Sequence, residues 1–224
     1  MKTLVASAPR SGSSYTAEFL GKLGAKTSKN GVITRGIFDV PRLRLVGAEI
    51  HANVLAWHEN PTDKIEAHEA DIEVSDLAVP WLQQFDACGW RIVHLVRDPY
   101  LSIASLVAAG GVELNNGERR DVLYGAPWAF YVPKIASAGE CKVNRAVRFW
   151  IDWNTAIECH ASERVHVEDD LELSAVADIH HPVNVAISKA TNHWGDYDAA
   201  AERERIEATP LAGELAEVAR RYGY

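Results

Sequence analysis

The sequence predicts an α/β domain in which helices flank a mainly parallel sheet. Short apolar runs typical of buried strands, of which "WRIVHLV" at 90–96 is the clearest, alternate with longer helical segments. This alternation favours strand–helix–strand units and hence parallel pairing. Two of these strands run directly into a polar loop that opens a helix, as in "KTLVASAPRSGSSYTAEFL" at 2–20. The carboxyl edge of the sheet is therefore where we expect a binding site.

Apolar periodicity and helix start and stop signals define the individual elements. Strands are expected at 2–8, 64–68, 90–96 and 164–167. Helices are expected at 13–23, 77–85, 144–160 and 210–221, with a further one from Pro99 to a stop at Gly110. Residues 111–142 lack sustained periodicity, so we expect a long loop or lid there.

Length and composition indicate one domain spanning 1–224, because 224 residues with 47% hydrophobic side chains can bury a sizeable core. The net charge of −8, without a basic block, argues against nucleic acid as a partner. No apolar run reaches the length of a signal peptide or membrane span, so no membrane partner is expected. Three scattered cysteines without metal-ligand spacing indicate reduced thiols and a cytoplasmic protein. No oligomeric state is predicted.

The first loop has the layout of a phosphate-binding loop, G-x-x-x-x-G-K-[ST], but lacks its first glycine and its lysine. Gly12 would let the backbone approach an anion, and the amides of Ser13 and Ser14 would point at it. Arg10 adds a permanent positive charge. The alternative is an ordinary strand-to-helix turn with a serine as N-cap. Without the lysine, ATP hydrolysis is disfavoured.

A second anion site is indicated at Arg97, which follows the strand at 90–96. Ser105 lies eight residues later on the next helix, so charge and hydroxyl together would clamp a phosphate. The alternative is a structural ion pair between Arg97 and Asp98 or Glu168, although Asp98 is also placed to cap the helix that Pro99 begins. Two sites at two strand ends fit one nucleotide that carries separate 3′ and 5′ phosphates.

These motifs resemble those of one family. "PRSGSSY" at 9–15 is similar to the 5′-phosphosulfate loop of the sulfotransferases, P-[KR]-[ST]-G-[ST]-[ST]. "LVRDPYLSIAS" at 95–105 resembles their 3′-phosphate motif, R-[DN]-P with a serine eight positions after the arginine. The separation of about 85 residues, the "RVHVEDD" segment at 164–170 and the closing "RRYGY" are also similar to bacterial members. The chain therefore resembles the sulfotransferases that use 3′-phosphoadenosine 5′-phosphosulfate (PAPS).

The resemblance implies a three-layer fold of the P-loop nucleoside triphosphate hydrolase type, PAPS as donor, adenosine 3′,5′-bisphosphate (PAP) as product, and no metal. It implies that the 5′-phosphosulfate is held by Arg10, Ser11, Gly12, Ser13 and Ser14. It assigns the 3′-phosphate to Arg97 and Ser105, and places Tyr15 where many members set a tryptophan against adenine. A sulfuryl carried on an α-phosphate leaves no γ-phosphate for the missing lysine to hold.

The chain departs from the family in three places. Arg10 stands where soluble members usually carry lysine, and Val167 replaces the tyrosine of a "YED" motif. The C-terminal "RKG" phosphate loop is absent, with "NHWGDY" at 192–197 in its region. Lys189 or His193 would have to supply the remaining 3′-phosphate contacts.

Sulfuryl transfer by in-line displacement needs a base to take the proton of the acceptor, and positive groups to stabilise the leaving phosphate. Arg10 fits the second role. For the base, His68 is the first candidate, because "KIEAH" at 64–68 resembles the family strand that ends in a catalytic histidine. His51, His58, Glu66 and Glu69 remain alternatives.

The acceptor is expected to be a hydroxyl, or an amine, of a small molecule or a carbohydrate. Two other functions fit a phosphate loop of this kind. One is a P-loop kinase acting on a small molecule or nucleotide, and the other is a non-catalytic nucleotide-binding module.

Overall fold

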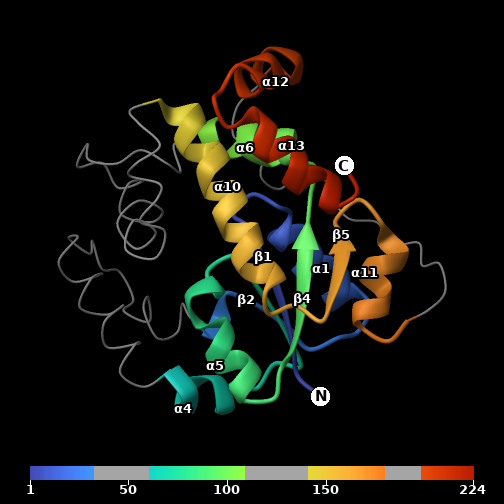
Figure 1. Cartoon of the computed structure of the whole chain (residues 1–224). Helices are drawn as coiled ribbons and strands as arrows, with labels where there is room; N and C mark the ends of the chain where they lie inside the picture. The colour runs from blue at the N-terminus through green and yellow to red at the C-terminus, as the bar shows by residue number, and fades with distance from the viewer. Residues whose placement is uncertain (33–60, 109–140, 180–197) are drawn as a thin grey trace, which may run out of the picture.

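The computed structural model describes residues 1–32, 61–108, 141–179 and 198–224, which are coloured in Figure 1. Several expectations lie outside the described residues. They are the lid at 111–142 except for its last two residues, the alternative bases His51 and His58, and the 3′-phosphate candidates Lys189 and His193.

The core of the fold is a five-stranded, all-parallel sheet with the order β2-β3-β1-β4-β5. The strands are β1 (Thr3–Ser7), β2 (Thr27–Lys29), β3 (Ile72–Ser75), β4 (Arg91–Val96) and β5 (Glu163–His166). In Figure 1 the arrowheads of β4 and β5 both point toward the side of the molecule that carries the C label. The predicted α/β fold with a parallel sheet is therefore confirmed.

Helices cover both faces of the sheet, because successive strand side chains point to opposite sides. Val5 of β1 packs against α1 (Ser13–Lys22) and α11 (Asp170–Val176). Leu4 of β1 faces the larger core on the other side. The described helices on that side are α4 (Pro61–Glu66), α5 (Leu82–Ala87), α6 (Pro99–Ala108), α10 (Lys142–Glu158), α12 (Ala199–Glu207) and α13 (Ala212–Arg221). In Figure 1, α10 crosses in front of the sheet and α1 lies behind it.

Most predicted elements are confirmed to within a few residues, but the strand at 64–68 is wrong. That segment overlaps α4, which begins at Pro61 and buries Ile65 against α5. Proline is favoured in the first turn of a helix, and a single apolar residue did not distinguish the two states. The strand lies instead at Ile72–Ser75. The cap on α6 is confirmed, since Asp98 Oδ1 accepts from the amides of Tyr100 at 2.8 Å and Leu101 at 3.1 Å.

One buried histidine joins the sheet to α10. His94 of β4 is 1% exposed, and its Nε2 lies 2.9 Å from Asn154 Oδ1. The Asn154 amide donates to the Trp150 carbonyl at 2.8 Å, so the oxygen faces the imidazole and Nε2 carries the proton. Burial lowers the pKa of His94 from 6.5 to about 4, although the bond to Asn154 opposes this.

Acidification should therefore destabilise the fold through His94. Its pKa is lower in the folded than in the unfolded chain, so the stability present above the unfolded value is lost as pH falls toward about 4. From this group alone, the free energy of unfolding should fall by about 3 kcal/mol between about pH 7 and about pH 4. Urea unfolding of wild type and His94→Gln at several pH values measures how steeply the free energy of unfolding falls with pH in each protein. Parallel losses in the two proteins would show that His94 is not responsible.

Candidate functional site

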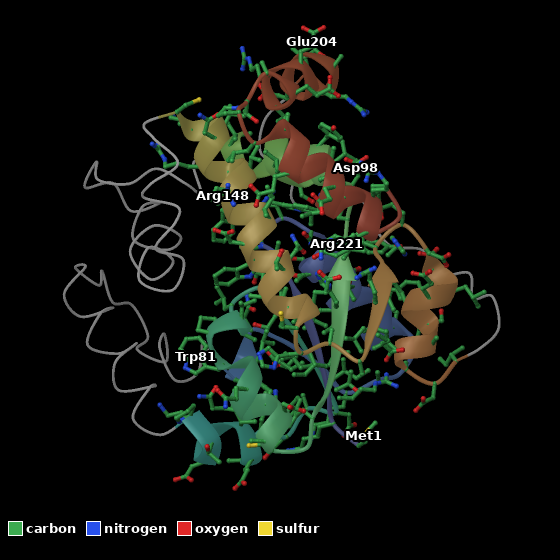
Figure 2. The ribbon with its side chains drawn as sticks, viewed as in Figure 1. Met1, Trp81, Asp98, Arg148, Glu204 and Arg221 are labelled. Carbon is green, nitrogen blue, oxygen red and sulfur yellow. The ribbon has the colours of Figure 1, made fainter. Side chains whose placement is uncertain are left out.

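The order of the strands creates a topological switch point at the carboxyl edge between β1 and β4. From β1 the chain passes through α1 toward β2 on one side of the sheet, whereas β4 leads through α6 toward β5 on the other. Such a switch point is where ligands bind in open α/β sheets. The loop at 8–12 follows β1, and Arg97 and Asp98 follow β4. Both motifs singled out in the sequence therefore flank the switch point, and Asp98 of the second motif is labelled in Figure 2.

The two motifs are in direct contact. Arg97 Nη1 donates to the Arg10 carbonyl oxygen at 2.9 Å. Arg10 Nε donates to Ser105 Oγ at 2.9 Å, across 95 residues of sequence. Arg10, Arg97 and Ser105 are thus brought together, and the Arg10 side chain points toward the second motif.

The first loop has an unusual backbone. Arg10 has φ of 70° and Gly12 has φ of 87°, both in the left-handed region. The amide of Ser11 donates to the Ala8 carbonyl at 3.2 Å, and the bond from Arg97 fixes the carbonyl of Arg10. Such strain in a non-glycine residue is found mostly at functional sites. The first loop therefore carries local backbone strain at Arg10.

The serine cap of the alternative interpretation, an ordinary strand-to-helix turn, is not present on α1. Gly12 is the N-cap residue and makes no side-chain hydrogen bond, and the first turn holds no acidic residue. The first amides of a helix have no partner within it, and together with the helix dipole they attract an anion. Ser11 and Ser13 are 0% and 5% exposed, and the Ser11 hydroxyl has no hydrogen-bond partner among the described residues. This end of α1 is suited to an anion.

The structural ion pair considered for Arg97 is absent from the described part of the chain. Asp98 is engaged in capping α6. Glu168 Oε2 accepts from the hydroxyl of Tyr224 at 3.0 Å. The pKa of Tyr224 is raised, by burial first and then by the neighbouring Glu168 carboxylate, and the positive charge of Arg97 partly opposes this shift. The end of the chain thus lies beside the second motif, which the sequence did not indicate.

Val167, at the end of β5, packs directly over the first loop. A Cβ atom built on Gly12 would lie 2.4 Å from Val167 Cγ2. The backbone at position 12 thus requires glycine for two reasons besides anion binding, namely its positive φ and the close approach of Val167.

Tyr15 faces α11 across the surface of the molecule. Its hydroxyl donates to Asp170 Oδ1 at 2.9 Å, and its ring stacks on Phe19 with centroids 6.0 Å apart. Burial, followed by the bond to Asp170, raises its pKa to about 12. These contacts hold the ring against its own helix.

His68 is not brought to this edge. Its backbone lies near the amino ends of the strands, where Lys2 Nζ donates to its carbonyl. Its imidazole reaches toward Gly31, just after β2, where a Cβ built on the glycine would lie 3.4 Å from His68 Cε1. Its Nε2 is 3.0 Å from Glu73 Oε2, out of line for a hydrogen bond, and its ring stacks on Trp90. His68 is only 7% exposed and lies in a packed core, which favours a structural role for this residue. Glu66 and Glu69 lie at the same end, beside Lys2 and Lys26 respectively.

A carboxylate that the sequence analysis missed stands at the carboxyl edge. Asp76 directly follows β3, which pairs with β1 so that Ser75 lies opposite Ala6. Asp76 Oδ1 accepts from Asn30 Nδ2 at 2.7 Å, and the Asn30 Oδ1 atom accepts from Ser75 Oγ at 2.8 Å and from the Asp76 amide at 3.2 Å. The amide of Asn30 therefore orients one oxygen of Asp76. An acidic residue directly after a strand was the signal that could have revealed it.

A lysine was missed as well. Lys29, at the end of β2, donates from Nζ to Ser14 Oγ. It therefore approaches the start of α1 from a neighbouring strand rather than from within the loop.

No protein-family model matches this chain, and comparisons with characterised proteins and with solved structures find no match either. Within the described ranges, no group of histidine, cysteine, aspartate and glutamate side chains could hold a metal ion. No described helix is long and apolar enough to cross a membrane.

Taken together, the carboxyl edge of the sheet carries cationic groups, hydroxyls and helix amides near the switch point between β1 and β4, and one oriented carboxylate follows the neighbouring strand β3. The positive groups suit a ligand with more than one anionic centre. The carboxylate suits the acceptance of a proton from a bound hydroxyl or amine.

Proposed function

We propose that the protein is a sulfotransferase that moves a sulfuryl group from PAPS to a hydroxyl or amine of a small molecule or carbohydrate. The observation that carries the proposal is the contact between the two motifs, in which Arg97 holds the strained Arg10 backbone and Arg10 reaches Ser105. The two motifs therefore act on one ligand. The free cysteines Cys88, Cys141 and Cys159 fit a cytoplasmic location.

The charge of the donor suits this edge. PAPS carries a phosphosulfate at one end and a phosphate at the 3′ position. The loop at 11–14 and the start of α1 would hold the phosphosulfate, and Arg97 with Ser105 the 3′-phosphate. Arg10 lies between them, since its backbone is in the first loop and its side chain touches the second motif. A P-loop type of fold follows from the same proposal.

When bound, PAPS supplies an activated sulfuryl group on a phosphate leaving group. Asp76 would take the proton of the acceptor as the acceptor oxygen or nitrogen bonds to sulfur. The bond from sulfur to the phosphate oxygen breaks, and its electron pair stays on that oxygen. The amides at the start of α1 would stabilise this growing negative charge, leaving PAP. Asp76 replaces His68 as the proposed base, because Asp76 lies at the carboxyl edge and His68 does not.

Calorimetry with adenosine 3′,5′-bisphosphate and with Mg-ATP tests the proposal. The bisphosphate should bind, and Arg97→Gln should weaken it at least tenfold, because a charged hydrogen-bond donor is lost. Arg205→Gln, on the exposed side of α12, is the control and should not change the affinity. Thermal melting of each variant checks that folding is retained.

The same titrations separate the rival functions. Tight binding of Mg-ATP with no response to the bisphosphate would replace the proposal with a P-loop kinase. Binding of the bisphosphate without transfer of labelled sulfate from PAPS to any hydroxyl or amine in a broad panel would indicate a non-catalytic nucleotide-binding module.

A further inference from the structure

Lys29 reaches the start of α1 from the side of the helix that faces the sheet. It pairs in register with Val74, whose side chain packs in the core beneath α1. Neighbouring residues of parallel strands point to the same face, so the stem of Lys29 runs along that side. Its ammonium group then donates to Ser14 Oγ in the first turn of α1.

A lysine in this position is electrostatically unfavourable without an anion. The amino end of a helix carries partial positive charge, which repels a cation. Among the described residues, Lys29 has no ion pair, whereas Lys22 pairs with Glu18 at 2.8 Å and Lys26 with Glu69 at 3.7 Å. The first turn of α1 also provides no acidic side chain. Lys29 is solvent-exposed, so its positive charge is accessible to a ligand that binds at the start of α1.

Arg10 is turned toward the other end of the site. Its Nε donates to Ser105 Oγ, so its charge lies toward the second motif. At Ser14, Lys29 provides a cation. The fully buried Ser11 hydroxyl, which lacks a partner among the described residues, adds an unused donor in the same loop.

We infer that Lys29 binds the anionic 5′ group of the nucleotide donor, supplying from β2 the charge that phosphate loops take from a lysine of their own. This inference rests on the proposed function. It divides the cations of the site, with Lys29 at the 5′ phosphosulfate and with Arg97, supported by Arg10, at the 3′-phosphate.

The division is tested by titrating adenosine 5′-monophosphate, adenosine 3′-monophosphate and the 3′,5′-bisphosphate. Lys29→Gln should lower the affinity for the 5′-monophosphate and for the bisphosphate about tenfold, and it should leave the affinity for the 3′-monophosphate unchanged. Arg97→Gln should weaken the 3′-monophosphate and the bisphosphate. Lys29→Arg should retain most of the affinity. Lys26→Gln is the matched control. It removes a lysine just before the same strand, and the charge of that lysine is already paired with Glu69.

The outcomes distinguish this inference from the proposed function. If wild type binds the bisphosphate and Lys29→Gln binds it as tightly as Lys26→Gln does, the inference is overturned and the proposed function stands. Equal weakening of all three ligands by Lys29→Gln also overturns it, because Lys29 would then not act at the 5′ end. If wild type binds none of the three, the proposed function itself fails.

Discussion

Replacing Asp76 with asparagine should lower the rate of sulfuryl transfer by about 10²–10⁴-fold, the usual contribution of a positioned general base. Asparagine can still bond to the side chain of Asn30, but it cannot accept the proton of the acceptor. The affinity for adenosine 3′,5′-bisphosphate should change little, because Arg97, Ser105 and the first loop are untouched. Single-turnover transfer of labelled sulfate, followed by calorimetry on the same sample, measures both quantities.

Two controls make this result specific to the carboxylate. Asp86→Asn removes an exposed carboxylate of α5 and should leave transfer unchanged. His68→Gln should also retain the rate wherever melting shows that it folds, because His68 lies in the core beside Glu73. A protein that keeps its rate without Asp76 and loses it without His68 would contradict the assignment of the base.

The first loop and the second motif could be predicted from the sequence because each is contiguous. A strand, a loop with glycine and serine, and a helix follow one another within 2–23, so local patterns hold the information. The same is true of β4, Arg97 and Asp98. That the two motifs meet was also expected, because parallel strands place their carboxyl ends at one edge.

Asp76 and Lys29 could not be predicted in this way. Lys29 is the last residue of β2, and Asp76 directly follows β3. These strands lie near the first loop only because the sheet has the order β2-β3-β1, which local sequence patterns do not reveal. The strand β3 was itself missed, since Glu73 interrupts its apolar run. In the structure the Glu73 carboxylate is fully buried beside His68, so each residue accounts for the presence of the other polar group in the core. The histidine chosen by local similarity lies in the core, whereas the carboxylate that we propose as the base is positioned by long-range strand pairing.

Replacing Gly12 with alanine should lower the free energy of unfolding by about 3 kcal/mol, from left-handed strain and overpacking together. Its φ of 87° is unfavourable for a side chain, and the new Cβ would lie 2.4 Å from Val167 Cγ2. Val167 is held at the end of β5, so either it or the loop must move. Urea unfolding measures the loss of stability, and titration of the bisphosphate measures the displacement of the loop.

Gly24 supplies a matched control for the backbone part of this effect. It has φ of 93°, and a Cβ built there meets nothing within 4 Å. Gly24→Ala should therefore cost only about 1 kcal/mol, for the positive φ alone. Adding Val167→Ala to Gly12→Ala should recover part of the excess, because it removes the methyl group that the new Cβ meets. If Gly12→Ala and Gly24→Ala cost the same, and Val167→Ala recovers nothing, then Val167 does not constrain the loop.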